Sequence, residues 1–267
     1  MLMGLQSQIQ GRPAYPSDSV RRLLPEPDPG PLDVSELIAG LRLGDQATAD
    51  RPYTVANLIE SVDGRASFDG RSSALGDDGD KQVFRALRSV CDVVLAGTGT
   101  LAAEHYGRLV RDADVQAARE RSGLAPQPLL CTVTRSGHIP PEIPLLTDPD
   151  ARMVIYSGAE VELGEVAAAV EVITVDPARL SIAAALHDLR VRLQAGLVLC
   201  EGGPTVLAQL IGDSAIDELF LTFAGKLAGG AGPTIVSGLT LQDPLAVSLR
   251  WLLEQDGSLF LRYGFGG

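Results

Sequence analysis

The feature of this chain that most constrains its fold is a pair of glycine-bearing turns, each placed between a short apolar run and helix-prone sequence. The first glycine turn, Gly97-Thr98-Gly99-Thr100, follows the run 92–96, and the second, Glu201-Gly202-Gly203-Pro204, follows the run 196–200. Short runs of continuous apolar character are typical of buried parallel strands. Parallel strands need crossover connections, so repeated strand, turn and helix units favour an α/β sheet.

From Tyr53 onward, strand-like and helix-like segments alternate along the chain. The sequence predicts strands over 53–62, 92–96, 129–134, 153–157, 171–175, 196–200, 217–224, 245–253 and 258–263. It predicts helices after Thr98 and over 81–90, 112–121, 161–169, 180–193 and 205–211, the helix over 81–90 being capped by Asp77, Asp78 or Asp80. No helix separates the last three strands, which favours antiparallel pairing near one edge. We therefore expect a three-layer α/β domain with a mostly parallel mixed sheet and antiparallel C-terminal strands.

Residues 1–51 have a different character, because they are rich in proline, aspartate and glycine. The proline-rich run 24–31 cannot sustain a helix or a central strand. We predict an irregular N-terminal arm over 1–51, with one short helix over 34–41 that begins near Asp33 or Ser35, followed by a single domain over 52–267. Apolar residues make up 45% of the chain and charged residues 21%, which is sufficient for a buried sheet.

Charge and cysteine content exclude several classes of partner. A net charge of −12 without a basic cluster argues against nucleic-acid binding. The cysteines Cys91, Cys131 and Cys200 form no CxxC pair and lie at no metal-ligand spacing, so we expect buried thiols in a reducing compartment and no metal site. The start of the chain lacks a signal-peptide pattern and no later run approaches membrane-spanning length, which predicts a cytoplasmic protein.

The glycine turns are predicted to carry the chemistry. A strand that ends in glycine and passes directly into a helix exposes backbone N–H groups and the positive end of the helix dipole, which suits a pyrophosphate. Neither turn matches the GxGxxG fingerprint or the P-loop, and one such turn alone is more often explained by tight packing. Two of them at the ends of separate parallel strands favour a ligand.

A third strand end, Thr134-Arg135-Ser136, places a guanidinium beside two hydroxyl groups. This combination suits the adenosine 2′-phosphate that distinguishes NADPH from NADH. An exposed arginine in an ordinary turn explains these residues equally well.

Taken together, these segments resemble the reductase domain of the bifunctional deaminase-reductase of riboflavin biosynthesis, which has a dihydrofolate-reductase-like fold. They are most similar to stand-alone actinobacterial pyrimidine reductase family proteins. The resemblance extends from about Val20 to Tyr263 and rests on four segments, 57–64, 92–100, 201–205 and 227–232. It implies an NADPH-dependent oxidoreductase that transfers hydride to a ribosylamino-pyrimidine, and a homodimer.

The resemblance also implies which residues form the site. The cofactor would be bound by Gly97, Thr98, Gly99, Thr100, Glu201, Gly202, Gly203, Pro204 and Thr205, with Thr134, Arg135 and Ser136 at its adenosine end. Asn57 and Ser61 would approach the nicotinamide and the substrate. Asp63 would serve as a proton relay or would anchor the pyrimidine edge, although an Asp-Gly pair is also a common turn signal. Ser72 would bind substrate hydroxyls, unless it is simply solvated.

Departures from the family pattern leave three functions open. The zinc signature of the deaminase is absent, which excludes deamination. The family's Asp-Pro-Arg-Leu run, which helps to bind the ribose phosphate, is replaced by 103–109, where Arg108 is the phosphate ligand that remains, with Arg65 or Arg71 as helpers. The leading prediction is a reductase of a pyrimidine or pterin-like substrate, resembling 5-amino-6-(5-phosphoribosylamino)uracil reductase. The alternatives are a dihydrofolate-reductase-like activity and a sensor that binds NADPH or a flavin precursor without turnover.

Overall fold

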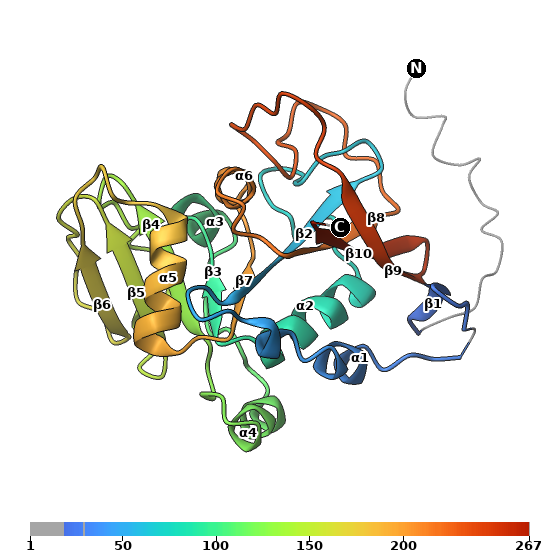
Figure 1. The fold of residues 1–267 in the computed structure, drawn as a ribbon, viewed down its shortest axis with the longest axis horizontal. Helices are drawn as coiled ribbons and strands as arrows, with labels where there is room; N and C mark the ends of the chain where they lie inside the picture. The colour runs from blue at the N-terminus through green and yellow to red at the C-terminus, as the bar shows by residue number, and fades with distance from the viewer. Residues whose placement is uncertain (1–18, 29, 267) are drawn as a thin grey trace.

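A computed structural model describes residues 19–28 and 30–266, and the strands in these residues form one sheet (Figure 1). The order across the sheet is β1-β9-β10-β8-β2-β7-β3-β4-β5-β6. The strands are β1 (Arg21–Leu24), β2 (Tyr53–Ser61), β3 (Val93–Leu95), β4 (Leu129–Thr134), β5 (Arg152–Ser157), β6 (Ala169–Thr174), β7 (Leu197–Cys200), β8 (Glu218–Ala224), β9 (Val247–Gln255) and β10 (Ser258–Phe265). The helices are α1 (Val34–Gly40), α2 (Asp78–Val90), α3 (Thr98–Ala103), α4 (Ala113–Arg121), α5 (Ile182–Leu193) and α6 (Pro204–Gly212), with 3-10 turns at Leu43–Gln46 and Pro144–Thr147.

The pairing within the sheet is mostly parallel. The strands from β8 through β2, β7, β3, β4 and β5 to β6 all run parallel to their neighbours. The pairs β8 with β10, β10 with β9 and β9 with β1 are antiparallel. This confirms the predicted mixed sheet with antiparallel C-terminal strands.

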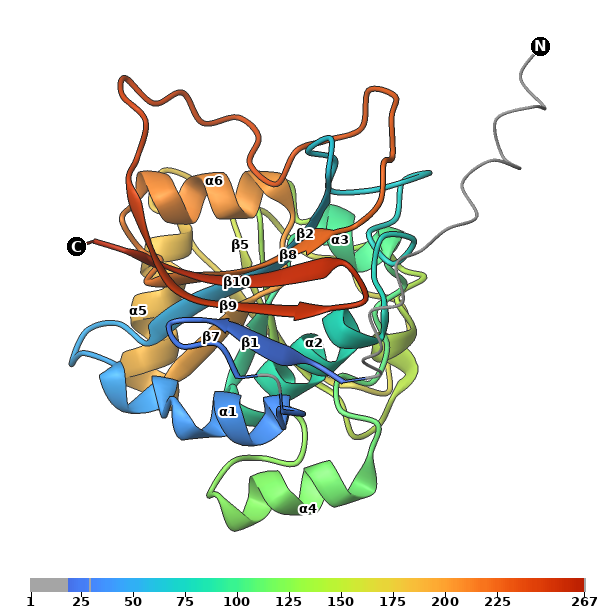
Figure 2. The ribbon, with the colours of Figure 1, turned by 90° about the vertical axis from the view of Figure 1, so that its right-hand side faces the viewer.

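Two layers of helices cover the sheet, α1 and α2 on one face and α6 on the other (Figure 2). Two neighbouring residues of β2 pack against helices on opposite faces of the sheet. Val55 lies in a cluster with Ile38 of α1 and Leu87 of α2. Ala56 lies in a cluster with Leu186 of α5 and Leu210 of α6. Side chains alternate between the faces of a strand, so a continuously apolar strand is buried on both sides. The predicted three-layer arrangement is therefore present.

The described part of the N-terminal arm is more regular than the sequence predicts. The strand β1 pairs with β9, and α1 begins at the predicted cap, where the Asp33 carboxylate accepts hydrogen bonds from the backbone of Ser35 and Glu36. Val20 and Ile38 are almost fully buried. The expectation of an irregular arm is thus wrong for this part, because its apolar residues add to the core. The rest of the arm, residues 1–18, lies outside the described residues.

One predicted helix, over 161–169, does not form. Val161, Leu163 and Val166 pack against the core from an irregular segment, and β6 begins at Ala169. The backbone N–H groups of residues 167 and 168 both donate to the Leu146 carbonyl instead of to a helical partner. Apolar residues spaced two and three apart fit an irregular segment that crosses the core as well as a helix. Among the described residues no helix is long and apolar enough to cross a membrane.

Candidate active site

The two glycine turns lie against each other at the carboxyl ends of β3 and β7, which are neighbours in the sheet. The Gly97 N–H donates to the Gly202 carbonyl at 2.9 Å. A Cβ on Gly97 would lie 3.1 Å from Val206 Cγ2, and a Cβ on Gly203 would lie 2.9 Å from Thr100 Oγ1. A side chain at either position would crowd these neighbours, so glycine favours the close approach of the turns.

The helices that follow these turns are the two in the described chain that lack a side-chain cap. Side-chain oxygens cap the other four helices, α1, α2, α4 and α5. The helix α3 starts after Gly97 and α6 starts after Gly203, and neither glycine supplies a capping group. The first N–H groups of a helix need acceptors, and an anion is well suited to provide them. Two uncapped helix starts on adjacent strands thus form a place for a phosphate-bearing ligand.

The third predicted segment reaches the same edge of the sheet, because β4 lies next to β3. Arg135 is exposed and forms no ion pair within the described chain, and its Nη1 donates to the Pro177 carbonyl at 3.4 Å. Ser136 is also exposed, and its hydroxyl oxygen accepts from the His138 backbone at 3.3 Å. Thr134 is buried, with its hydroxyl turned toward the His138 carbonyl. The guanidinium of Arg135 is the group best placed to meet an anion here.

Glu201 has a role that differs from the predicted one. Its carboxylate is buried and receives two hydrogen bonds from Arg88, at 2.6 and 2.7 Å, and a third from the Tyr106 hydroxyl at 2.6 Å. Its backbone N–H donates to Leu95. Glu201 therefore holds the second glycine turn in place, and its carboxylate is taken up by Arg88 and Tyr106. Arg88 and Tyr106 were missed because nothing in the spacing of positions 88, 106 and 201 links them.

Burial and charge act together on this cluster. Burial lowers the pKa of Arg88 and is the largest single effect, but the charge of Glu201 and the hydrogen bonds to it together outweigh burial, so the pKa is raised. Burial, followed by the same carboxylate charge, raises the pKa of the Tyr106 hydroxyl. The cluster is thus an ionised arginine and a carboxylate bound by a neutral phenol.

Asp63 lies in an exposed turn after β2 and clamps a second loop to it. The Ser61 hydroxyl donates to Oδ1 at 2.7 Å, and the backbone N–H groups of Ala228 and Gly229 donate to Oδ1 and Oδ2 at 2.9 and 2.7 Å. The bond from Ser61, followed by those from the two N–H groups, lowers the pKa of the Asp63 carboxyl well below its ordinary value. A carboxyl that stays ionised is a poor proton donor, so this geometry disfavours the predicted proton relay. The alternative interpretation of Asp63-Gly64 as a turn agrees with the structure. The Gly64 N–H donates to the Ser61 carbonyl at 2.8 Å, and φ of Gly64 is +74°.

Of the predicted substrate ligands, Ser61 is engaged within the protein through its hydroxyl, whereas Ser72 is engaged through its backbone N–H. Ser61 is fully buried, and its hydroxyl oxygen also accepts from the Arg65 backbone at 3.0 Å. The Ser72 N–H donates to the Glu104 carboxylate at 2.7 Å, which ties the loop after β2 to the end of α3. These two serines therefore shape the rim of the site through contacts with neighbouring loops.

Arg108 does not fit the predicted role of phosphate ligand. Its guanidinium is paired with Asp148 at 2.7 and 2.9 Å and with Asp150 at 2.6 Å. Both carboxylates precede β5 and so lie toward the amino end of a parallel strand, opposite the edge that carries the glycine turns. The bonds to Asp148 and then Asp150 raise the pKa of Arg108. Because two carboxylates already pair with this guanidinium, it is not available to bind a substrate phosphate.

Asn57 occupies the position where β2 and β7 separate. The two strands are paired up to Ala56 and Cys200, and β2 then continues with β8 alone on its other side. The Asn57 side chain is 8% exposed, and its Oδ1 is buried without a hydrogen bond among the described residues. A buried amide in this state is a site where a ligand can supply the partner.

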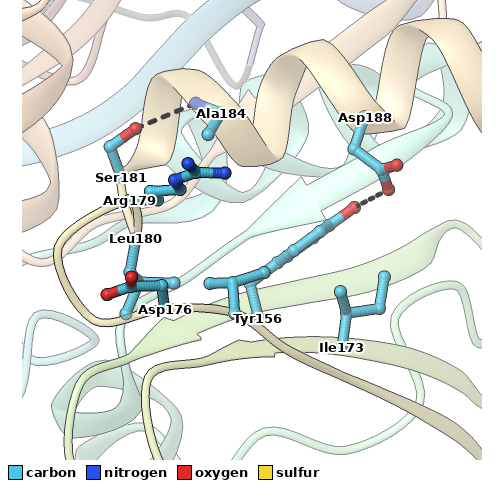
Figure 3. Close-up of a pocket in the computed structure, with 9 residues that line it drawn as sticks. Tyr156, Ile173, Asp176, Arg179, Leu180, Ser181, Ala184 and Asp188 are labelled. Carbon is cyan, nitrogen blue, oxygen red and sulfur yellow. Dashed lines mark hydrogen bonds between the residues drawn. The ribbon is translucent and has the colours of Figure 1, made fainter.

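A pocket lies further along the sheet, between α5 and the strands β5 and β6 (Figure 3). It has a volume of about 400 Å³. Two of its polar lining residues bind each other, since the Tyr156 hydroxyl donates to Asp188 at 2.6 Å. The pocket includes Asp176, next to the Pro177 that contacts Arg135. The pocket therefore borders the part of the site near Arg135. It does not include the glycine turns, where the uncapped helices α3 and α6 begin.

Comparison with known proteins agrees with this geometry. A family model described as the RibD C-terminal domain matches residues 52–256. The chain belongs to the RibD C-terminal domain family. It is 28% identical over 192 residues to a protein of Archaeoglobus fulgidus named 2,5-diamino-6-ribosylamino-4(3H)-pyrimidinone 5′-phosphate reductase, a match that covers 70% of this chain and 87% of that protein.

Members of the RibD C-terminal domain family also occur within longer proteins. The chain is 28% identical over 209 residues to the riboflavin biosynthesis protein RibD of Mycobacterium tuberculosis, covering 76% of this chain and 50% of that relative. A solved structure of a pyrimidine reductase-like protein from Corynebacterium diphtheriae has a TM-score of 0.70 at 19% identity, covering 88% of this chain and 100% of that one. The relatives whose names state an activity are pyrimidine reductases.

Proposed function

We propose that this protein is an NADPH-dependent reductase of a pyrimidine substrate. The observation that carries the proposal is the pair of uncapped helix starts, α3 and α6, which meet at adjacent glycine turns with the unpaired Arg135 one strand away. A dinucleotide needs a place for its pyrophosphate and, if it is NADPH, a cation for its 2′-phosphate. The residues present fit both needs.

In this proposal the chain's own residues bind and align the reactants. The N–H groups of Thr98, Gly99 and Thr100 at the start of α3 bind the pyrophosphate together with the Thr205 N–H of α6, because Pro204 has no N–H and the Val206 N–H donates to the Gly203 carbonyl. Arg135 with Ser136 binds the 2′-phosphate. The separation of β2 from β7 beyond Ala56 leaves room for the nicotinamide and the substrate to meet beside Asn57. The cofactor supplies the hydride when bound. Alignment of donor and acceptor supplies most of the rate, since the protein has no covalent step to perform.

The relatives' names and the engaged side chains support a pyrimidine as the substrate. The Archaeoglobus fulgidus relative is named for a ribosylamino-pyrimidinone phosphate. A dihydrofolate-reductase-like activity would use Asp63 as a carboxylate inside the cavity, whereas Asp63 is exposed and held by Ser61 and two backbone N–H groups. One observation still favours the alternative of a sensor without turnover. Arg108 is paired with two carboxylates and is not available to bind the ribose phosphate of a substrate.

Three further parts of the proposal concern the setting of the site. We propose that residues 52–267 form a single reductase domain with a dihydrofolate-reductase-like fold, and that it acts in the cytoplasm. The three buried, unpaired cysteines fit a reducing compartment. We also propose a homodimer, supported by the exposed apolar residues Leu245, Val247 and Leu249 at the start of the antiparallel strands.

Titration with NADPH and NADH, followed by nicotinamide fluorescence, tests the cofactor. We expect NADPH to bind more tightly, and Arg135→Ala to weaken NADPH binding about tenfold while leaving NADH binding unchanged. Arg152→Ala is the matched control, because Arg152 is exposed at the start of β5, away from the glycine turns. Failure of both nucleotides to bind would overturn the proposal. Binding of NADPH without oxidation in the presence of ribosylamino-pyrimidines would favour the sensor.

A further inference from the structure

Glu60, near the end of β2, is an acid that the proposed function does not use. The strand β2 pairs with β7 up to Ala56, and Glu60 lies four residues further along, beyond the point where the two strands separate. Its side chain shares a face of β2 with Leu58, because side chains alternate along a strand. Leu58 reaches the second glycine turn, since a Cβ on Gly202 would lie 3.3 Å from Leu58 Cδ2. Two residues of a strand span about 6.6 Å, so Glu60 is the next side chain on this face beyond the cofactor turn.

Residues 226–237, which we call the roof segment, connect the end of β2 with the second glycine turn. The roof segment follows β8, and its Pro233 carbonyl accepts from the Ala66 N–H, in the loop after β2, at 2.8 Å. It then reaches the start of α6, where the Ser237 N–H donates to the Pro204 carbonyl at 3.2 Å. The roof segment therefore spans the place between β2 and α6 where the proposed function puts the nicotinamide.

The surroundings of Glu60 are apolar. Its neighbour on β8 is Phe223, and Ile235 and Val236 of the roof segment pack against the same apolar cluster as Leu58. The Glu60 side chain is half-buried, and no group in the described part of the chain forms a hydrogen bond or an ion pair with its carboxyl. Burial raises the pKa of this carboxyl.

Basic residues of the adjoining loops do not supply a counter-ion for Glu60. Lys226 Nζ donates to the carbonyls of residues 74–76, and Arg65 Nη1 donates to the Gly232 carbonyl at 2.9 Å. Neither of these cations, nor Arg71 in the loop after β2, affects the pKa of Glu60. A carboxylate that has lost part of its hydration without gaining a cation is stabilised by a ligand that brings a positive charge.

We propose that Glu60 is the counter-ion of the nicotinamide ring and favours the oxidised, positively charged form of the cofactor. This role rests on the NADPH-dependent reductase proposed above and concerns the charge balance of the same site. Transfer of a hydride, one proton with two electrons, to the substrate carbon leaves the ring with a positive charge that the reduced ring lacks. A carboxylate beside the ring stabilises this charge as it develops, which lowers the barrier to the transfer.

The contribution of Glu60 depends on pH, because only the ionised carboxyl pairs with the ring. Burial raises the pKa of Glu60 in the free protein, and the positive ring of bound NADP⁺ lowers it again. The stabilisation of NADP⁺ is therefore complete above the raised pKa and is lost as the pH falls through it. NADPH has a neutral ring and the same phosphates, so the titration of the phosphates cancels when the two nucleotides are compared.

Calorimetric titration of the full chain with NADP⁺ and with NADPH tests the proposal, because the two ligands differ only in the ring. We expect Glu60→Gln to weaken NADP⁺ binding about fivefold and to leave NADPH binding unchanged. Glu60→Asp keeps the charge and should retain most of the NADP⁺ affinity. Glu36→Gln, which removes an exposed acid of α1, is the matched control and should leave both affinities unchanged.

The pH dependence of the two affinities provides a second measurement that a structural role would not change. Between about pH 8 and pH 5, the wild type should lose NADP⁺ affinity relative to NADPH affinity at the acid end, and Glu60→Gln should show a constant ratio. Equal weakening of both nucleotides by Glu60→Gln, or a ratio that this variant does not change, would overturn the counter-ion role while leaving NADPH binding intact. Failure of the wild type to bind either nucleotide would overturn the proposed function as well.

Discussion

Arg88 and Glu201 form a two-point ion pair, with bonds of 2.6 and 2.7 Å, directly beneath the second glycine turn. The pair joins α2 to the end of β7, although the two residues are more than 100 positions apart in the chain. The guanidinium also lies 4.1 Å from the centre of the Phe84 ring. The position of the turn is thus set by a buried charge pair and not by the glycines alone.

Arg88→Met is expected to destabilise the protein by about 3–5 kcal/mol, because it leaves the Glu201 carboxylate buried with Tyr106 as its one remaining side-chain partner. Arg192→Met is the control. Arg192 pairs with Glu171 and Asp188 at the surface, where the loss should stay within about 1 kcal/mol. Urea unfolding followed by the fluorescence of the single tryptophan, Trp251, measures both. Similar losses of unfolding free energy in the two variants would show that the buried pair contributes no more to stability than the surface pair.

Gly99→Ala separates the needs of the fold from those of the cofactor. Nothing lies within 4 Å of the Cβ that this change adds, and alanine favours helix α3, of which Gly99 is the second residue. The free protein should gain up to about 1 kcal/mol in stability, while NADPH binding weakens about tenfold because the methyl group occupies the space of the pyrophosphate. Gly40→Ala, at the open end of α1, should be equally tolerated by the fold without any change in NADPH binding. Unchanged NADPH affinity in Gly99→Ala would place the phosphates elsewhere.

Much of the fold follows from local sequence. A helix start was predicted near Asp33 or Ser35 and another at Asp77, Asp78 or Asp80, and the structure places the caps at Asp33 and Asp77. The strand over 129–134 has the predicted limits. The helix expected over 161–169 fails because apolar spacing there serves a crossing segment whose backbone bonds go to Leu146. Local patterns report which residues are buried, and they do not report which distant carbonyl will satisfy the backbone.

The site likewise contains some features that local sequence predicts and others that depend on distant contacts. The glycine turns were visible because glycine marks a close backbone approach wherever it is required. Arg108 looked like a phosphate ligand because its partners, Asp148 and Asp150, are 40 residues away in sequence and give no local sign. Asp80 looked like a helix cap for the same reason, since its contact with Thr222 exists only once α2 lies on β8.

Asp63→Asn tests whether Asp63 donates a proton or holds a loop. The lowered pKa means that the clamp on Ala228 and Gly229 is complete above the ordinary aspartate pKa of about 3.9 and is lost only as the pH falls through the lower value of the folded state. The pH profile of kcat/KM should therefore keep its shape between pH 5 and 9 in the variant, at about a tenfold lower level. Hydrogen exchange at the amides of Ala228 and Gly229 should become faster. Loss of one limb of the pH profile in the variant would restore the proton relay.

Removal of the N-terminal arm tests its place in the fold. Deletion of residues 1–26 removes β1 and the fully buried Val20, which leaves one edge of β9 unpaired. The lost burial should lower the free energy of unfolding by at least about 2 kcal/mol. The unpaired edge should also promote association between molecules, which light scattering detects, because open strand edges are templates for pairing. Deletion of residues 1–18 alone keeps β1 and serves as the control. If the longer deletion behaved like the shorter one, the pairing of β1 with β9 would contribute nothing measurable to the domain.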